Sequence, residues 1–77
     1  MLKGAREAIV RDVARIAIHD QAYVQVLYSP VDEPDKTYQA RVGVESVYPE
    51  LAQGHRVQVH TLMNVVTRIE ATGDSDA

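Results

Sequence analysis

The stretch from Tyr48 to Val59 constrains the fold of this chain more than any other part of the sequence. Pro49 presets the backbone for a first helical turn, and Gly54 can end such a turn with a positive φ. From Arg56 onward apolar and polar residues alternate, as they do in a half-buried strand. We therefore expect a short helical turn over about 47–52 that leads directly into a strand.

The size and composition of the chain favour one small domain with a thin core. It has 77 residues and no cysteine, so no disulfide supplements the core. It also lacks tryptophan and phenylalanine, so the core must be built from valine, isoleucine and leucine, which favours β-structure. We expect a single domain over residues 1–71, followed by a flexible acidic tail over 72–77.

Four segments, including the one that begins at Arg56, have the composition of strands. Residues 23–28 are rich in β-branched and aromatic side chains, and residues 37–44 alternate between apolar and polar side chains. Between them, residues 29–36 contain two prolines and three acids, which is typical of a loop. Residues 56–61 and 65–70 are separated by a short turn. The sequence thus predicts two antiparallel hairpins, with Asn64 in a left-handed conformation in the second.

The segment from Ala5 to Ile18 is compatible with two periods. As a helix it has one apolar stripe, made of Ile9, Val13, Ile16 and Ala17. As a strand it has one apolar face interrupted by Asp12 and made of Ala8, Val10, Ala14, Ile16 and Ile18. Both possibilities stay open at this stage.

If residues 5–18 are extended, the chain has three strands, a helical turn and a final two-stranded hairpin. This order, with a Pro-x-Leu-x-x-Gly-x-x-Val-x-Val pattern that begins at Pro49, resembles the OB-fold over about residues 7–70. The resemblance implies an all-β, five-stranded OB-like barrel with a short helix between strands 3 and 4, capped by Glu45 or Ser46. One departure is that such barrels often bend their long first strand at a glycine, and residues 5–18 contain none. The alternative is an α+β fold in which an N-terminal helix packs on a three- or four-stranded antiparallel sheet.

The sequence contains no pattern that carries catalysis or metal binding. The three histidines, His19, His55 and His60, lack the spacing of a convergent ligand set and are expected on the surface. The glycines do not form a phosphate-binding loop, and no serine has the context of a nucleophile. We therefore expect no catalytic residue, no metal site, no cofactor and no enzymatic activity.

The charge of the chain lowers the odds of nucleic-acid binding, because such binding depends on neutralising phosphates. The formal net charge is −3 and the estimated pI is about 5.4. The acids are concentrated in residues 32–35 and in the tail, however, so that the remaining body is slightly basic. No segment approaches the roughly 20 apolar residues of a membrane span. We expect a cytoplasmic protein with no membrane contact.

The candidate binding residues follow from the prediction of an OB-like barrel. Barrels of this type that bind single strands use the face of the second and third strands, with aromatic side chains for stacking and cations for the backbone. One face of these strands carries Tyr23, Gln25, Leu27, Gln39 and Arg41. A single tyrosine and a single arginine make a thin platform for nucleic acid. Single-stranded RNA or DNA binding is therefore the alternative function.

Association with another protein, or with itself, is the leading functional class. Leu27 lies on an otherwise polar face, and Leu62, Met63 and Val66 are apolar residues near the last hairpin. A small domain with a thin core gains stability when such residues are covered. We expect a non-catalytic binding or assembly module that acts through protein-protein contacts or forms a homo-oligomer.

Overall fold

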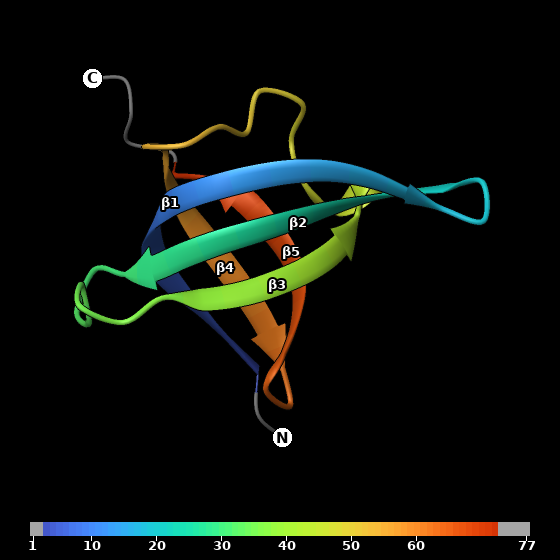
Figure 1. Ribbon diagram of the computed structural model, residues 1–77. Coiled ribbons are helices and arrows are strands. Elements are labelled where there is room, and N and C mark those ends of the chain that lie inside the picture. Colours follow the sequence, from blue (N-terminus) through green and yellow to red (C-terminus); the bar gives the residue numbers. More distant parts are fainter. Residues whose placement is uncertain (1–2, 73–77) are drawn as a thin grey trace.

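The computed structural model describes residues 3–72, which form one five-stranded antiparallel sheet (Figure 1). The strand order is β3-β2-β1-β4-β5, and no α-helix occurs in this part of the chain. The all-β prediction is therefore confirmed, and the alternative with an N-terminal helix is wrong. The strands are β1 (Lys3–Ile18), β2 (Gln21–Pro30), β3 (Tyr38–Gly43), β4 (Arg56–Leu62) and β5 (Val65–Ala71).

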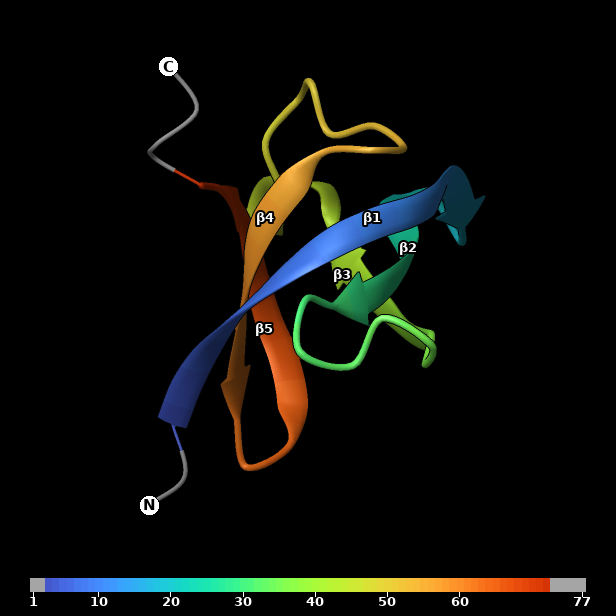
Figure 2. The ribbon, with the colours of Figure 1, turned by 90° about the vertical axis from the view of Figure 1, so that its left-hand side faces the viewer.

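The long strand β1 is the middle strand of the sheet and pairs antiparallel with two neighbours. Its first half, Lys3–Ile9, pairs with β4, whereas Ala8–Ile18 pairs with β2. Figure 2 shows β1 crossing the molecule between β4 on one side and β2 on the other, which curls the sheet around its core. The outermost strands β3 and β5 lie close to each other, but no ladder joins them within the described residues. Along the chain, three strands, a short 3₁₀ turn and a two-stranded hairpin follow one another in the expected order, while closure into a barrel is not observed.

A β-bulge at Arg11 bends β1, a strand with no glycine between residues 5 and 18. The register with β2 shifts between Val10 and Asp12, so Arg11 is an extra residue without a partner in β2. An extra residue reverses which side chains point to the core. Ala8 and Val10 are buried before the bulge, and Val13 packs against the core after it. The single apolar face expected for this strand is therefore wrong in its second half.

Val10, next to the bulge, bonds to the connection between β3 and β4. The Val10 N–H donates to the His55 carbonyl at 2.9 Å, and the Gly54 N–H donates to the Val10 carbonyl at 2.8 Å. Gly54 has the expected positive φ, at 91°. Leu51 is 2% exposed and joins the core cluster. The connection thus covers one end of the curled sheet by burying Leu51.

The expected helical turn over residues 47–52 is wrong. The only helical element among the described residues is the 3₁₀ turn η1 (Val44–Ser46), which follows β3 directly and has no side-chain cap. Glu45 and Ser46 lie inside it rather than before a helix. Further along, single backbone bonds from Leu51 to Tyr48 and from His55 to Ala52 close isolated turns. So short a segment gains too few helical hydrogen bonds to offset nucleation, and Leu51 is held by the core instead.

The core is aliphatic, as the composition predicts. Its residues come from all five strands and from the β3–β4 connection, and full burial of each larger side chain contributes roughly 1.5–3 kcal/mol. The alternation expected for β3 and β4 places their apolar residues correctly. The buried hydrophobic residues are Ala8, Val10, Val24, Val26, Ala40, Val42, Leu51, Val57, Val59 and Ile69.

Both two-residue hairpin turns use left-handed backbone at non-glycine positions. His19 and Asp20 have φ values of 52° and 67°, and Met63 and Asn64 have 53° and 69°. Such a pair of positive φ angles is the geometry of a type I′ turn. Asn64 adopts the left-handed conformation that asparagine tolerates, and Met63, for which nothing in the sequence indicated it, shares that conformation. Histidine, aspartate and asparagine tolerate it better than methionine does.

The last described residue, Thr72, is bonded to the start of β4. Thr72 is buried, and its N–H and hydroxyl both donate to the Arg56 carbonyl, at 3.3 and 3.1 Å. The rest of the expected tail, 73–77, lies outside the described residues. Within residues 3–72, no helix has the length and apolar character needed to cross a membrane.

Substitution of Gly54 by alanine is predicted to destabilise the fold by about 1–2 kcal/mol, because an L-residue is strained at a φ of 91°. No atom lies within 4 Å of the added Cβ, so the cost is conformational. Gly4→Ala is the matched control, since its Cβ also meets open space and its φ is not positive. Urea unfolding measures both variants. An equal effect of the two substitutions would contradict this account.

Substitution of Met63 by glycine is predicted to stabilise the fold by about 0.5–1 kcal/mol. The substitution removes the strain of the left-handed conformation at position 63, roughly 1–2 kcal/mol. Part of this gain is lost, because glycine raises the conformational entropy of the unfolded chain. The side chain is 70% exposed, so few contacts are lost. Met63→Ala keeps the Cβ and should stay close to the wild type. Thermal unfolding that ranks alanine above glycine would show that Met63 is not strained.

Candidate protein-binding face

The structure brings the five residues predicted as a binding site onto one face of two adjacent strands. Gln25 of β2 lies opposite Arg41 of β3, and Leu27 lies opposite Gln39. Tyr23 lies in the next row, opposite Gly43. Residues directly opposite each other in an antiparallel pair point to the same side of the sheet. This side faces away from the core, which takes Val24 and Val26 from β2.

Strand β1 adds residues to this face that the sequence reasoning missed. Because of the bulge, Asp12 lies opposite Leu27, Ala14 opposite Gln25 and Ile16 opposite Tyr23. Ile18, the next residue of β1 whose side chain points to this face, is 36% exposed. The interruption of the apolar alternation at Arg11 and Asp12 was the available signal. We call this surface the outer face of β1–β3: Asp12, Ala14, Ile16, Ile18, Tyr23, Gln25, Leu27, Gln39 and Arg41.

Arg11 bounds the outer face of β1–β3 at one end. Its Nε donates to the Ser29 hydroxyl at 3.0 Å, and its Nη2 donates to the Pro34 carbonyl at 3.4 Å. Ser29 is buried, and its hydroxyl also contacts that of Thr37 at 3.4 Å. The Arg11 guanidinium therefore reaches from β1 to the β2–β3 loop. Beyond it, the outer face continues as a strip of half-buried or exposed apolar side chains.

The charges of the outer face of β1–β3 differ from those on the other half of the sheet. Within residues 3–72, neither Arg41 nor Asp12 takes part in an ion pair. The Asp12 carboxylate accepts a hydrogen bond from the neighbouring Val13 N–H at 3.0 Å. Apolar side chains and unpaired charges of both signs thus share this face.

On the first half of β1 and on β4 and β5, exposed charges instead pair with each other. Arg56 Nε lies 3.0 Å from Glu7 Oε2. Glu70 lies 3.0 Å from His60 and 3.2 Å from Arg68 through its two carboxylate oxygens. These cross-strand and same-strand contacts satisfy the charges within the chain. This half of the sheet leaves fewer charged groups for a partner.

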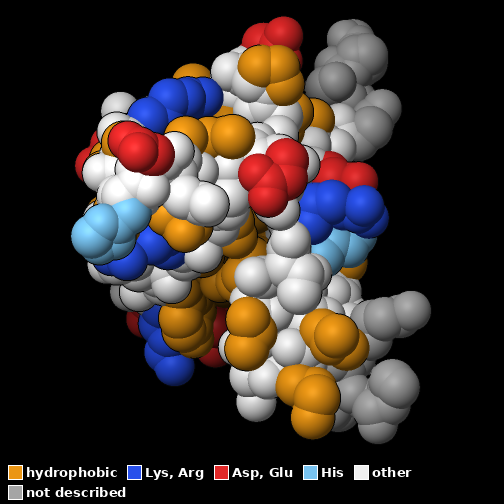
Figure 3. Space-filling view, turned by 90° about the vertical axis from the view of Figure 1, so that its right-hand side faces the viewer, with side chains coloured by type: hydrophobic (Ala, Val, Ile, Leu, Met, Phe, Trp, Pro, Cys, Tyr) orange, Lys and Arg blue, Asp and Glu red, His pale blue; other side chains and the backbone are white. Residues whose placement is uncertain are grey.

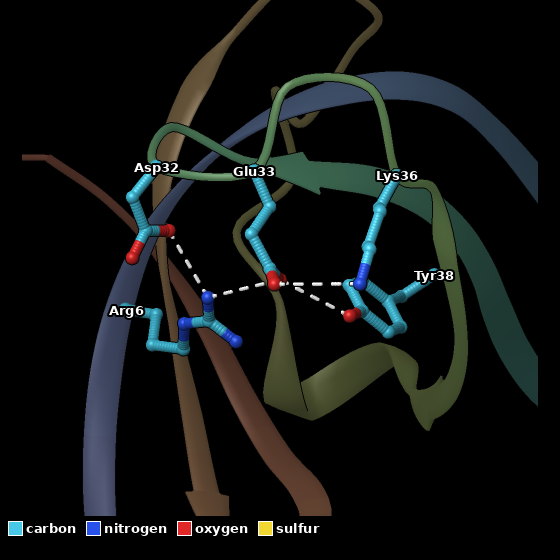
Figure 4. Close-up of polar contacts among 5 residues, drawn as sticks. All are labelled: Arg6, Asp32, Glu33, Lys36 and Tyr38. Carbon is cyan, nitrogen blue, oxygen red and sulfur yellow. Dashed lines mark hydrogen bonds and ion pairs between the residues drawn. The ribbon is translucent and has the colours of Figure 1, made fainter.

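A cluster of exposed charges ties the β2–β3 loop to β1 (Figure 4). Arg6 Nη2 lies 3.0 Å from Asp32 Oδ1 and 3.3 Å from Glu33 Oε1. The Tyr38 hydroxyl donates to Glu33 Oε1 at 3.1 Å, and Lys36 Nζ lies 3.7 Å from Glu33 Oε2. Figure 4 shows Glu33 at the centre, between Arg6 and the pair formed by Lys36 and Tyr38. We call these five residues the loop clasp.

The loop clasp holds Glu33 in its charged form. The Tyr38 hydroxyl, and then Arg6, lower the pKa of the Glu33 carboxyl by hydrogen bonding to its carboxylate. Hydrogen bonds to Asp32, and then to Glu33, raise the pKa of the Arg6 guanidinium. The clasp therefore occupies two of the cations of the chain in structural contacts. Those two are less available to a polyanion.

A second apolar surface lies at the tip of the β4–β5 hairpin. Leu62, Met63 and Val65 are all exposed. Figure 3 shows hydrophobic side chains grouped at its lower edge, where this hairpin lies. Val66, which the sequence placed with them, is half-buried against the core instead. A groove of about 770 Å³ adjoins Leu62 and is lined by polar side chains that include Glu45, His60 and Arg68.

The histidines with side-chain contacts are held by structural partners. His55 Nδ1 lies 2.8 Å from the Tyr48 hydroxyl, and the two rings are stacked at 6.0 Å. Burial, and secondarily Glu50, raises the pKa of the Tyr48 hydroxyl, which keeps it protonated. His60 pairs with Glu70. Within the described residues, no group of three or more histidine or acidic side chains is arranged to hold a metal ion.

Comparisons with known proteins do not assign this chain to a family. No protein-family model, no curated protein and no solved structure matches it. The features of this chain that bear on its function are therefore the geometry of the outer face of β1–β3 and the charges around it.

The loop clasp predicts acid sensitivity that Glu33 controls. A carboxyl whose pKa is lowered on folding stabilises the protein above its unfolded value, here 4.5, and loses this contribution as the pH falls through the folded pKa. Glu33→Gln should therefore be less stable than the wild type at neutral pH, and the difference should disappear in strong acid. Thermal unfolding against pH measures it. Asp35→Asn, which removes a carboxylate of the same loop outside the clasp, is the control. A pH-independent offset for Glu33→Gln would contradict the role of the clasp.

Proposed function

We propose that this protein is a non-catalytic binding or assembly module that uses the outer face of β1–β3 to contact another protein chain. The observation that carries the proposal is the combination, on one sheet face, of half-buried or exposed apolar side chains and unpaired charges. Protein interfaces are built in this way, with an apolar centre that includes aromatic residues and with arginine enriched over lysine. Tyr23, Leu27 and Ile16 supply the centre, and Arg41 and Asp12 flank it.

The energetics support contact with a partner. Covering apolar surface contributes about 25 cal/mol per Å² removed from water. Ile16, Tyr23 and Leu27 are half-buried by their neighbours in the sheet, and Ile18 is more exposed. Because sheet side chains are already restricted by cross-strand neighbours, ordering them on binding costs less than ordering a loop. The face is therefore suited to binding without rearrangement.

A non-catalytic role is supported by the contacts of the groups that most often act in catalysis. The side-chain hydrogen bonds of His55 and His60 go to Tyr48 and Glu70. The buried Ser29 hydroxyl contacts Arg11 and Thr37, neither of which is a general base at neutral pH. We also retain the cytoplasm as the expected compartment.

Single-stranded nucleic-acid binding receives less support from the same face. Base stacking uses several aromatic side chains, and the outer face of β1–β3 offers Tyr23 alone. Four cations elsewhere, Arg6, Lys36, Arg56 and Arg68, are paired with carboxylates. Arg41 remains as the main cation on the face. A protein partner needs fewer cations and fits the apolar strip better.

Photo-crosslinking in the host cell tests the proposal. A photoreactive amino acid replaces Gln25 on the outer face or, as a control, Gln58 on β4, which is also glutamine and also half-buried. We expect protein adducts, either with a second copy or with another protein, at position 25 and few at position 58. Adducts with RNA or DNA at position 25 would favour the alternative function. Equal adducts at both positions, or none, would overturn the proposed face.

A further inference from the structure

We propose that the outer face of β1–β3 binds a second copy of this chain, face to face, around a two-fold axis that runs along β2. This inference rests on the proposed function and names its partner. The two unpaired charges of this face, Asp12 and Arg41, lie on either side of β2.

The strand register fixes these positions. Asp12 lies on β1 beside Leu27, and Arg41 lies on β3 beside Gln25, so β2 separates the two charges. Leu27 and Gln25 belong to neighbouring rows of the same face. Within one chain Asp12 and Arg41 form no ion pair, with each other or with any other described residue. Each is therefore an exposed charge that still lacks a partner of opposite sign.

A two-fold axis along β2 supplies that partner to both charges. It preserves the direction of the strands and places β1 of one copy over β3 of the other. Asp12 of each copy then lies within one row of Arg41 of the second copy, which a long arginine side chain can span. The dimer gains two identical ion pairs that the single chain cannot make. A face with this property is self-complementary, as an isologous dimer requires.

The centre of the same face suits this arrangement. Tyr23, Gln25 and Leu27 lie on β2, so each meets its own counterpart across the axis. Sheets that pack face to face are about 10 Å apart, which leaves room for both sets of side chains. Apolar and aromatic contacts at the axis are thus flanked on both sides by an Asp12–Arg41 pair.

The size of the surface also favours this face over the β4–β5 tip. A stable dimer covers about 800 Å² on each copy, which is about one seventh of the 5181 Å² that the chain exposes. The tip has only three exposed apolar side chains on a convex turn. The outer face of β1–β3 extends over three adjacent strands and is bounded only at one end by Arg11.

Charge reversal and sedimentation test the inference. We expect the wild type to dimerise as its concentration rises from micromolar to millimolar. Asp12→Arg and Arg41→Asp should each weaken the dimer by about tenfold or more, because each replaces two attractions by two repulsions. The double variant should recover it. Asp35→Arg, on the β2–β3 loop, makes the same change in net charge as Asp12→Arg and should leave dimerisation unchanged. Circular dichroism verifies that each variant is folded.

Cross-linking gives a second measurement that does not depend on charge. The chain has no cysteine, so Gln25→Cys introduces a unique thiol close to the axis, and Gln58→Cys introduces one on β4. A short bismaleimide should link two copies through position 25 and not through position 58.

The outcomes separate this inference from the proposed function. A protein that stays monomeric, or a dimer that charge reversal does not affect, overturns the second-copy inference. If photo-crosslinks at position 25 to another protein persist in that case, the proposed function stands with a different partner. Loss of those crosslinks removes the proposed function itself.

Discussion

The β-bulge at Arg11 is the feature on which the rest of this structure depends. By turning the chain within β1, it allows one strand to pair with β4 through its first half and with β2 through its second. Both backbone groups of Val10, next to the bulge, bond with His55 and Gly54. The connection that brings Leu51 into the core is therefore held at the point where β1 bends. The fully buried core residues of this chain are all aliphatic. The bend in β1 lets this small number of side chains meet in one core from several directions.

The same bulge decides what the molecule presents to its surroundings. Beyond Arg11 the side chains of β1 change sides, so Ile16 points away from the core and lies beside Tyr23. Without the extra residue, Ile16 and Ile18 would continue the buried row of Ala8 and Val10. The exposure of these isoleucines is thus a consequence of how the sheet bends, and the apolar strip follows from the architecture. The absence of paired charges on that strip is a separate property of the sequence.

The local pattern of the sequence predicts the parts of the fold where it is regular. Alternation identifies β2, β3 and β4, and with them the shared face of Gln25 and Arg41, because side-chain direction in a strand follows a period of two. It fails in β1, where one unpaired residue breaks the period and makes a helix equally consistent with the pattern. It fails again over 47–52, where burial of Leu51 prevails over a weak local preference for a helical turn. The contribution of β1 to the candidate face could not be predicted, since it requires the position of the bulge.

The two halves of the sheet show why charge pairing, more than apolar exposure, distinguishes the candidate face. Exposed apolar residues occur on both the β1–β3 face and the β4–β5 tip, and single exposed hydrophobic side chains are common on any protein. On the first half of β1 and on β4 and β5, however, exposed charges are matched within the chain, as in Arg56–Glu7 and Arg68–Glu70. Asp12 and Arg41 are not matched, although the same strands could have carried residues that pair across β2 or none at all. An arrangement with one charge on either side of a central strand is satisfied most directly by a surface with the same arrangement reversed, and a second copy of the chain has that surface.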